Sequence, residues 1–473
     1  MRISHCFRLT RLLLALLTLW AGATTVTAAA PEEPPKRILF LFADDLGWGD
    51  LKSNGSDYGV TFQIDRLAQE GTTFTQFYTP ASVCSPSRVG VMSGRFPGEL
   101  GFHTVISGVK RNAELGILDF LDPELPMLPR LLKSAGYRTA HFGKWHLGTS
   151  QGMRAPLPDA YGIDEHRVTT GRGNTWENED DPFFRSESSN LIVNETIRFL
   201  DQHRDERCFV NLWFLLTHAT LNPTEEELEA FRSRMPVGTS HPGATAIYLA
   251  SLRNLDVAVG RLLTWLDEQG MAEDTLVLFS SDNGPEDITI RNASHSGVGS
   301  AGPFRGRKRS LYEGGIRLPL LARWPGHIPA GEVNDSVVAG VDLLPTLCRF
   351  AGVELPDDMR LSGEDRSAVL LGAREARSKS LFWEWRYRIP GQVLNRSPIL
   401  AMREGPWKLL MNPDGSRKEL YRIGEDPMEL QNLADRQTDV VESMSESLRQ
   451  WYATLPEAPI DEDAGKAEWA WPK

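Results

Sequence analysis

Four polar side chains that could bind a metal ion follow two separate apolar segments of the chain. Asp44 and Asp45 come directly after one apolar run, and Asp282 and Asn283 come just after another. In an open α/β sheet, ligands bind beyond the carboxyl ends of the strands, so we expect these side chains to lie together. Their oxygen atoms suit a hard cation such as Ca²⁺ or Mg²⁺ better than zinc. Adjacent acids are also typical of a solvated turn, but two clusters after two buried runs favour the metal site.

Basic side chains follow two more apolar runs in the same way. Lys144 and His146 come after residues 138–142, and His218 comes after residues 209–216. If the chain is extended there, Lys144 and His146 point to the same side, because alternate residues of an extended chain share a face. We therefore expect these groups at the same edge of the sheet as the acids.

Cys84 lies at the predicted start of a helix. Ser85 is a good N-cap and Pro86 a good first helical residue. Cys84 would then stand at a helix N-terminus, where the dipole favours negative charge, with Arg88 about one turn away. Taken as a plain cysteine, Cys84 is either an activated thiol or a small buried hydrophobe. The spacing of Pro86 and Arg88 from Cys84 favours a reactive residue over a buried hydrophobe.

The motifs that hold these residues resemble the sulfatase family of the alkaline phosphatase superfamily, of the arylsulfatase and N-acetylgalactosamine-6-sulfatase type. Residues 84–88 (CSPSR) with Ser93-Gly94-Arg95 are similar to the family's C-x-P-S-R signature and its T-G-R trailer, with Ser93 in place of Thr. The other similar segments are 42–50 (FADDLGWGD), 143–148 (GKWHLG), 281–284 (SDNG), 306–308 (GRK), 313–317 (EGGIR) and the tail from Glu419 to Ala434.

The resemblance implies that a maturation enzyme oxidises Cys84 to formylglycine (3-oxoalanine). One hydroxyl of the hydrated aldehyde attacks sulfur to give a covalent sulfo-enzyme intermediate, and the other expels sulfate. Arg88 is expected to stabilise the hydrate. The resemblance also implies Ca²⁺ as the metal, with Mg²⁺ less favoured. The implied ligands are Asp44, Asp45, Asp282, Asn283 and modified Cys84.

The resemblance further implies roles for four basic side chains. Lys144 and Lys308 should hold the sulfate oxygens. His146 should act as the base that deprotonates the second hydroxyl, and His218 should protonate the leaving alkoxide, with help from Lys308. The family often has Pro before that second histidine, whereas this chain has Thr217.

Strands that alternate with helices must position these residues. The apolar runs lack period-two alternation, which is typical of buried parallel strands covered on both faces. The predicted strands are 38–43, 138–142, 209–216 and 275–280, and the predicted helices are 127–134, 189–202 and 246–269. Residues 151–188 are predicted to form long loops. The resemblance adds that the fold is α/β, with a large mixed, mostly parallel sheet.

The pattern changes after about residue 375. Short antiparallel strands are predicted at 381–385, 398–403, 407–411 and 419–423, followed by a helix at 438–455. We therefore divide the chain into a signal peptide (1–30), a catalytic domain (31–375) and a small α+β subdomain (376–473).

The N-terminal segment and the charge indicate an exported protein that does not bind nucleic acid. Residues 1–30 hold a basic start, a short apolar run and small residues, as in a secretory signal. No other segment is apolar enough to enter a membrane stably, and a bacterial periplasmic or secreted protein is expected. The net charge of −12 repels nucleic acid at long range. The mature chain would keep three cysteines, an odd number that argues against a disulfide framework.

The sequence therefore predicts hydrolysis of sulfate esters, with a sulfated carbohydrate as the expected substrate from the resemblance. Three alternatives remain. A phosphate or phosphonate ester hydrolase could use the same fold. A non-catalytic protein could bind sulfated glycans with Cys84 unconverted. A cysteine hydrolase could pair Cys84 with His146 or His218.

Overall fold

The computed structural model of the chain describes residues 33–150, 154–172, 176, 181–232, 235 and 239–466, with the backbone alone at 291–294. The predicted signal peptide lies outside the described residues. Within the described ranges, none of the helices is both long and apolar enough to cross a membrane.

A mixed sheet forms the centre of the molecule. Over the described residues it has nine strands in the order β4-β3-β5-β1-β6-β7-β2-β8, and β9 also pairs with β2. The strands from β4 to β6 are parallel, and β7 runs antiparallel to both of its neighbours. The strands are β1 Arg37–Ala43, β2 Thr72–Tyr78, β3 Tyr137–Lys144, β4 Glu165–Thr169, β5 Arg207–Trp213, β6 Thr275–Ser281, β7 Arg317–Arg323, β8 Glu332–Asn334 and β9 Val338–Ala339.

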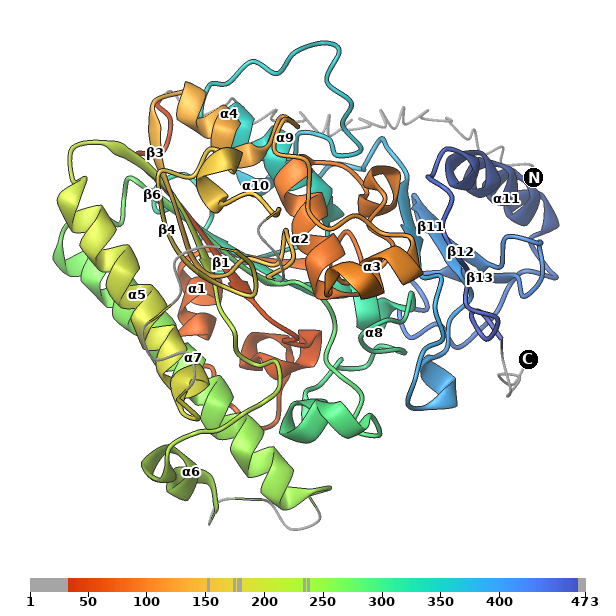
Figure 1. Cartoon of the computed structure of the whole chain (residues 1–473), viewed down its shortest axis with the longest axis horizontal. Coiled ribbons are helices and arrows are strands. Elements are labelled where there is room, and N and C mark those ends of the chain that lie inside the picture. Colours follow the sequence, from red (N-terminus) through yellow and green to blue (C-terminus); the bar gives the residue numbers. More distant parts are fainter. Residues whose placement is uncertain are drawn as a thin grey trace, which may run out of the picture.

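Helices cover both faces of this sheet (Figure 1). The α-helices of the described residues are α1 Ile64–Glu70, α2 Cys84–Ser93, α3 Val109–Leu115, α4 Leu128–Ser134, α5 Phe184–Gln202, α6 Glu225–Arg232, α7 Pro242–Glu268, α8 Glu313–Ile316, α9 Leu343–Phe350, α10 Ser367–Leu370 and α11 Thr438–Ala453. Successive side chains of a strand point to opposite faces. Phe40 and Phe42 of β1 accordingly pack in one buried cluster with α2, α4 and α9. Leu39 and Leu41 pack in a second cluster with α5 and α7.

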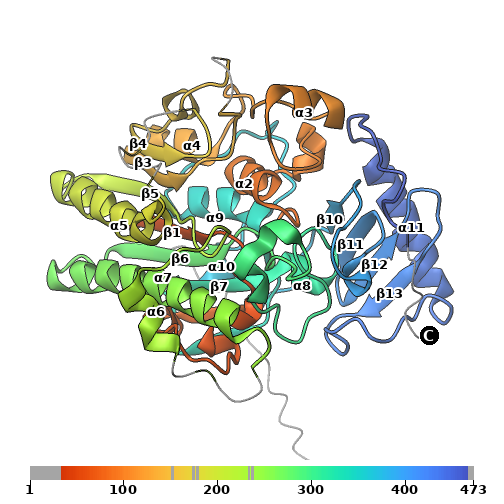
Figure 2. The ribbon, with the colours of Figure 1, turned by 60° about the horizontal axis from the view of Figure 1, so that its bottom comes forward.

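A second, antiparallel sheet of four strands lies beside the first (Figure 2). Its strands are β10 Leu381–Glu384, β11 Leu400–Glu404, β12 Trp407–Met411 and β13 Glu419–Arg422. One face packs on α11, and the other shares a buried cluster with Tyr78 and Phe96 of the larger part. This cluster joins residues from both sides of residue 375. The predicted domain boundary at that residue stays a prediction.

A buried ion cluster also connects the two parts. Lys408 of β12 places its Nζ 2.9 Å from Oε1 of Glu313 and 2.9 Å from Oε1 of Glu429. All three side chains are fully buried. Glu313 belongs to α8, beside the central sheet, so the lysine links the small sheet to the large one.

The predicted fold class is confirmed, whereas several elements differ from prediction. The sheet is mixed, as expected, but β2, β4, β7, β8 and β9 were not predicted. Residues 151–188 were predicted to be loops, yet β4 and the first turn of α5 fall there. In β7, Pro319 lies within a central strand, where the missing N–H normally argues against a strand.

Candidate active site

The four predicted metal ligands lie at the carboxyl ends of two paired strands. Ala43 of β1 is opposite Ser281 of β6, so Asp44 and Asp282 emerge side by side. The backbone N–H of Asp45 donates to Oδ1 of Asp282 at 3.2 Å, and Nδ2 of Asn283 donates to Oδ1 of Asp45 at 2.7 Å. All four side chains are buried.

Cys84 begins α2 and points at this cluster. Its Sγ and carboxylate oxygens of Asp44 and Asp282 all lie within 4.8 Å of one another. The predicted place of Cys84 at a helix N-terminus is confirmed, but the predicted cap is wrong. Val83 is the N-cap, and Ser85 lies within the helix, where its Oγ accepts the N–H of Ile106 at 2.8 Å.

Arg88 is completely buried behind Cys84. Its Nε and Nη2 donate to Oδ2 of Asp282 at 3.0 and 2.6 Å, and its Nη1 donates to the carbonyl of Lys144 at 3.2 Å. The guanidinium carbon lies 4.9 Å from the ring centroid of Trp213. These contacts hold the cation one helical turn from Cys84.

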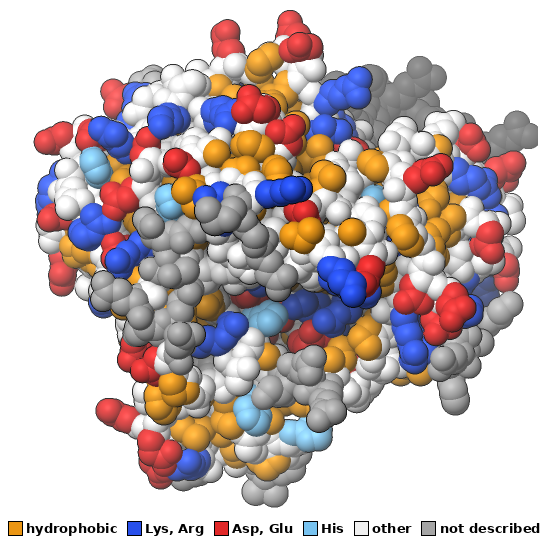
Figure 3. Space-filling view, viewed as in Figure 1, with side chains coloured by type: hydrophobic (Ala, Val, Ile, Leu, Met, Phe, Trp, Pro, Cys, Tyr) orange, Lys and Arg blue, Asp and Glu red, His pale blue; other side chains and the backbone are white. Residues whose placement is uncertain are grey.

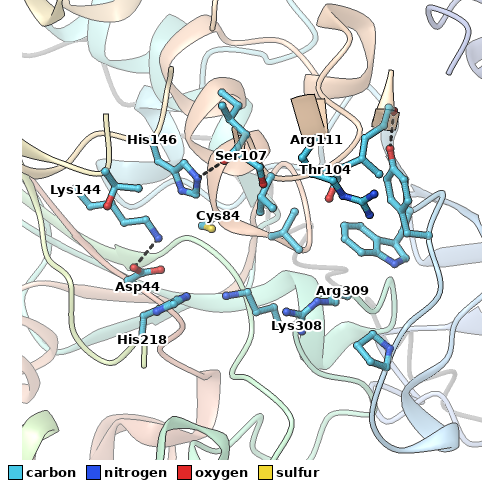
Figure 4. Close-up of a pocket in the computed structure, with 18 of the residues that line it drawn as sticks. Asp44, Cys84, Thr104, Ser107, Arg111, Lys144, His146, His218, Lys308 and Arg309 are labelled. Atoms are coloured by element: carbon cyan, nitrogen blue, oxygen red, sulfur yellow. Dashed lines mark hydrogen bonds and ion pairs between the residues drawn. The ribbon is translucent and has the colours of Figure 1, made fainter. Parts of the chain in front are cut away.

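Two lysines from different segments of the chain contact the acids. Lys144 ends β3 and donates to Oδ2 of Asp44 at 2.7 Å, a contact drawn in Figure 4. Lys308 donates to both carboxylate oxygens of Asp45, at 2.6 and 2.8 Å. Both lysines are buried and line the same pocket as Cys84.

Burial and the neighbouring cations set the protonation of the acids. Burial raises the pKa of Asp44, but the basic groups around it outweigh this effect, Lys144 first and then His218, Arg88 and Lys308, so the pKa is lowered well below its usual value. In Asp45, burial is likewise outweighed, chiefly by Lys308, and the pKa is lowered. Burial and the negative charge of Asp44 raise the pKa of Asp282 to about 8.

Both predicted histidines line the pocket in the neutral state. Burial and the charge of Lys144 lower the pKa of His146 to about 3, and its Nε2 pairs with the carbonyl of Ile106 at 3.0 Å. Burial lowers the pKa of His218 to about 4, although Asp45 and Asp44 oppose this. The Nε2 of His218 lies 3.8 Å from Oδ2 of Asp45, and its Nδ1 contacts the carbonyl of Ala219 at 2.5 Å.

The oxygen set fits a hard divalent cation. Among the described residues, Oδ1 of Asp44 and Oδ1 of Asn283 are buried without a hydrogen-bond partner. Buried polar atoms without partners are uncommon, and oxygens of this kind are what Ca²⁺ and Mg²⁺ bind. A cation held here would satisfy both atoms and lie beside residue 84.

The pocket above these residues has a volume of about 610 Å³ and opens to solvent. Figure 3 shows basic side chains and a histidine gathered in the hollow on this face. Asp44, Cys84, Lys144, His146, His218 and Lys308 line it, and the other predicted ligands lie in the buried layer behind. All ten predicted site residues are thus brought together.

Several lining residues were not predicted. They include Thr104, Arg111 and Arg185, and also Trp385, Tyr387 and Arg388, which follow β10. None of these residues belongs to the sequence motifs from which the site was predicted. Their positions at the pocket depend on how distant segments pack, for which the sequence carries no local signal.

Comparisons with known proteins agree with this geometry. Residues 36–353 match the family described as Sulfatase, and residues 302–454 match the family described as N-sulphoglucosamine sulphohydrolase, C-terminal. N-acetylgalactosamine-6-sulfatase of Sus scrofa is 34% identical over 417 residues, which cover 78% of this chain and 75% of that protein. Arylsulfatase A of Bos taurus is 31% identical over 484 residues, covering 91% of this chain and 90% of that protein.

The fold is also found among solved structures. Ps i-CgsB in complex with k-i-k-neocarrahexaose superposes with a TM-score of 0.74 at 24% identity, covering 90% of this chain and 94% of that one. At this identity the likeness concerns the fold alone. The family match and the two relatives show that the chain belongs to the sulfatase family and is a sulfuric ester hydrolase.

Proposed function

We propose that this protein is an exported hydrolase that removes sulfate groups from carbohydrate, using formylglycine made from Cys84 and a divalent cation, Ca²⁺ in preference to Mg²⁺. The observation that carries the proposal is the meeting of Cys84, Asp44 and Asp282 within 4.8 Å, in a pocket lined by two lysines and two histidines. That arrangement suits a tetrahedral anion held next to a nucleophile.

Asp44, Asp45, Asp282 and Asn283 would hold the cation together with residue 84. A bound Ca²⁺ supplies a positive charge that polarises oxygen atoms and neutralises charge on the sulfate. The Oδ1 atoms of Asp44 and Asn283, which are buried without a hydrogen-bond partner among the described residues, support this assignment. Because the pKa values of Asp44 and Asp45 are lowered, both carboxylates stay ionised at neutral pH and ready for a cation.

Oxidised residue 84 would supply the attacking hydroxyl through the hydrate of its aldehyde. Its place at the start of α2 favours negative charge on the attacking oxygen. Arg88 is held rigidly by Asp282 and Trp213, so it can donate to that oxygen without reorganising. A formylglycine-generating maturation enzyme is therefore a required partner.

Lys144 and Lys308 would hold the sulfate oxygens. Burial lowers the pKa of Lys308, but Asp45 and neighbouring groups outweigh it and raise the pKa above its usual value, so the cation persists. Preorganised cations stabilise charge that develops in the transition state.

The two histidines would move protons. Neutral His146 has its Nδ1 buried without a hydrogen-bond partner among the described residues, as a base needs. His218 must be protonated to act as the acid for the leaving alkoxide. A bound sulfate adds negative charge near its ring, which favours the protonated form.

The leaving-group side of the pocket supports a carbohydrate. Trp385, Tyr387 and Pro390, from the segment after β10, line it with polar and charged groups. Flat aromatic faces with nearby hydrogen-bonding groups are typical of sites for amphipathic ligands. The names of the relatives, N-acetylgalactosamine-6-sulfatase and a carrahexaose complex, point to the same class.

The test has two parts. The protein is expressed in a host that carries the maturation enzyme. Mass spectrometry of its tryptic peptide 67–88, which holds Cys84, should reveal an aldehyde that reacts with hydrazides. That protein should cleave sulfated oligosaccharides in the presence of Ca²⁺ and lose activity on chelation. Its Cys84→Ala variant should be inactive, whereas full activity of that variant would refute the proposal. Faster cleavage of phosphate or phosphonate esters would favour the alternative hydrolase.

A further inference from the structure

A further arginine lies in the wall of the active-site pocket. Arg185 is the second residue of α5, and it lines the pocket with Lys144 and His218. Its side chain is half-buried, whereas Phe184 and Ser186 on either side are buried. The proposed reaction gives this arginine no role.

The guanidinium of Arg185 is held beside the turn that carries His218. The carbonyl of Leu215 accepts a hydrogen bond from Nη1 of Arg185 at 3.3 Å and another from the N–H of His218 at 3.2 Å. Because both groups share one acceptor, Arg185 lies on the His218 side of the pocket. Figure 4 shows His218 and Lys144 on one side of Cys84 and Arg111 on the other.

The charge of Arg185 has no carboxylate partner within the part of the chain that the structure describes. The other lysines and arginines of the pocket each have one. These pairs are Lys144–Asp44 at 2.7 Å, Lys308–Asp45 at 2.6 Å, Arg309–Glu286 at 2.6 Å, Arg111–Glu114 at 3.1 Å and Arg388–Asp463 at 3.7 Å. Burial lowers the pKa of Arg185, with Asp44 and Asp45 acting in the opposite direction. The cost of desolvating this cation is therefore only partly offset.

We propose that Arg185 binds a second anionic group of the substrate, either a carboxylate or a further sulfate, carried by the leaving sugar or its neighbour. This inference rests on the proposed function, which places the leaving alcohol next to His218. The planar guanidinium pairs with carboxylate and tetrahedral oxyanions through parallel hydrogen bonds, which gives both affinity and orientation. The substrate class is then an acidic glycan rather than a neutral sugar with a single sulfate.

The test uses three disaccharides with the same sulfated sugar. The second sugar is neutral, carries a uronic carboxylate, or carries another sulfate. The matured wild-type enzyme should cleave at least one charged substrate with a kcat/KM about tenfold or more above that of the neutral one, as expected for hydrogen bonds to charged groups. The two charged arms distinguish carboxylate from sulfate recognition.

Arg185→Met should bring this ratio of charged to neutral substrate down to about one, because the charged hydrogen bonds are lost. Arg185→Lys keeps the charge without the fork and should retain part of the ratio. Arg198→Met is a matched control on the same helix, where Arg198 pairs with Glu165 and Glu195 at the surface. This control makes the same change in net charge and should keep the wild-type ratio.

Three results would overturn the inference. The wild type could cleave neutral and charged substrates equally. Arg185→Met could lower kcat/KM for all three substrates by the same factor, which would mean that the arginine supports the His218 turn. Arg388→Met, in the pocket-lining segment after β10, could abolish the ratio while Arg185→Met preserves it.

Failure of the proposed function gives a different result, since the wild type would then cleave none of the disaccharides. If Arg185→Met does not fold, the salt dependence of the wild type decides. Its kcat/KM for charged substrate should fall more steeply with ionic strength than that for neutral substrate, because salt screens the added charge pair. Equal salt dependence would refute a second anion site.

Discussion

Replacing Arg88 by methionine removes the cation that underlies both Cys84 and Asp282. The arginine donates twice to Oδ2 of Asp282 and once to the carbonyl of Lys144, and its guanidinium carbon lies 4.9 Å from the ring centroid of Trp213. Methionine is unbranched and apolar, is shorter than arginine, and offers none of these hydrogen bonds. The change therefore tests the loss of the buried charge together with its hydrogen bonds.

The structure gives an order of magnitude for the loss. Breaking a buried charge pair by removing one partner costs about 3–5 kcal/mol, because the remaining charge is left unpaired. At about pH 9, above the pKa of about 8 of Asp282, both groups are charged, and the cost should fall near the lower end of that range because the carboxyl can take up a proton when Arg88 is removed. Arg88→Met should thus lower the free energy of unfolding of the cation-free protein by about 3 kcal/mol.

Urea unfolding followed by tryptophan fluorescence measures this change. Arg88→Lys should lie between the wild type and Arg88→Met, since lysine keeps the charge but cannot donate bidentately. Arg198→Met, at a surface ion pair, should cost at most about 1 kcal/mol. If Arg88→Met stays within about 1 kcal/mol of the wild type, the assignment of a buried charge pair is wrong.

Three other predictions follow from the same geometry. Between about pH 6.5 and 8, ionisation of Asp282 should destabilise the cation-free protein as pH rises, because its folded pKa of about 8 lies above that of an unfolded aspartate. The melting temperature of Asp282→Asn should therefore fall less over this window than that of the wild type. Equal slopes of melting temperature against pH in the two proteins would contradict the pKa shift. Lys308→Met should lower kcat/KM for a sulfate ester by about 10²–10³-fold through loss of one clamp on the sulfate, whereas exposed Lys418→Met should leave steady-state rates unchanged. Lys408→Met should cost about 3–5 kcal/mol in the free energy of unfolding, because the two buried glutamates it contacts lose their shared cation; a loss below about 1 kcal/mol would count against this link between the sheets.

The small sheet contributes to the site as well as to stability. Its first strand, β10, ends at Glu384, and the next residues bring Trp385 and Tyr387 to the pocket. Lys408 holds the same sheet against α8, which follows directly after the loop of Lys308. One buried connection therefore supports both the part of the pocket lined by Trp385 and Tyr387 and the part lined by Lys308.

Local patterns in the sequence were enough to single out the polar residues that the structure brings together at the pocket. Asp44, Asp45, Asp282 and Asn283 follow apolar runs, and a helix-starting segment begins at Cys84, so short stretches of chain disclosed both the residues and their kinds of element. The central strands β1, β5 and β6 were predicted because strands buried on both faces are continuously apolar, and β3 was predicted from a weaker apolar run. Such runs indicate neither the direction of a strand nor its place in the sheet. β7 was missed because Pro319 argues against a central strand.

Only the tertiary structure decided which charges pair and which remain open to a substrate. Arg185 stands in an unremarkable helix start, and its importance comes from a carbonyl thirty residues away that it shares with His218. The protonation of Asp282 likewise depends on burial and on Asp44, which lies 238 positions earlier in the chain. Electrostatic energy depends on distance through space and on the surrounding dielectric, and neither quantity exists until distant segments have packed together.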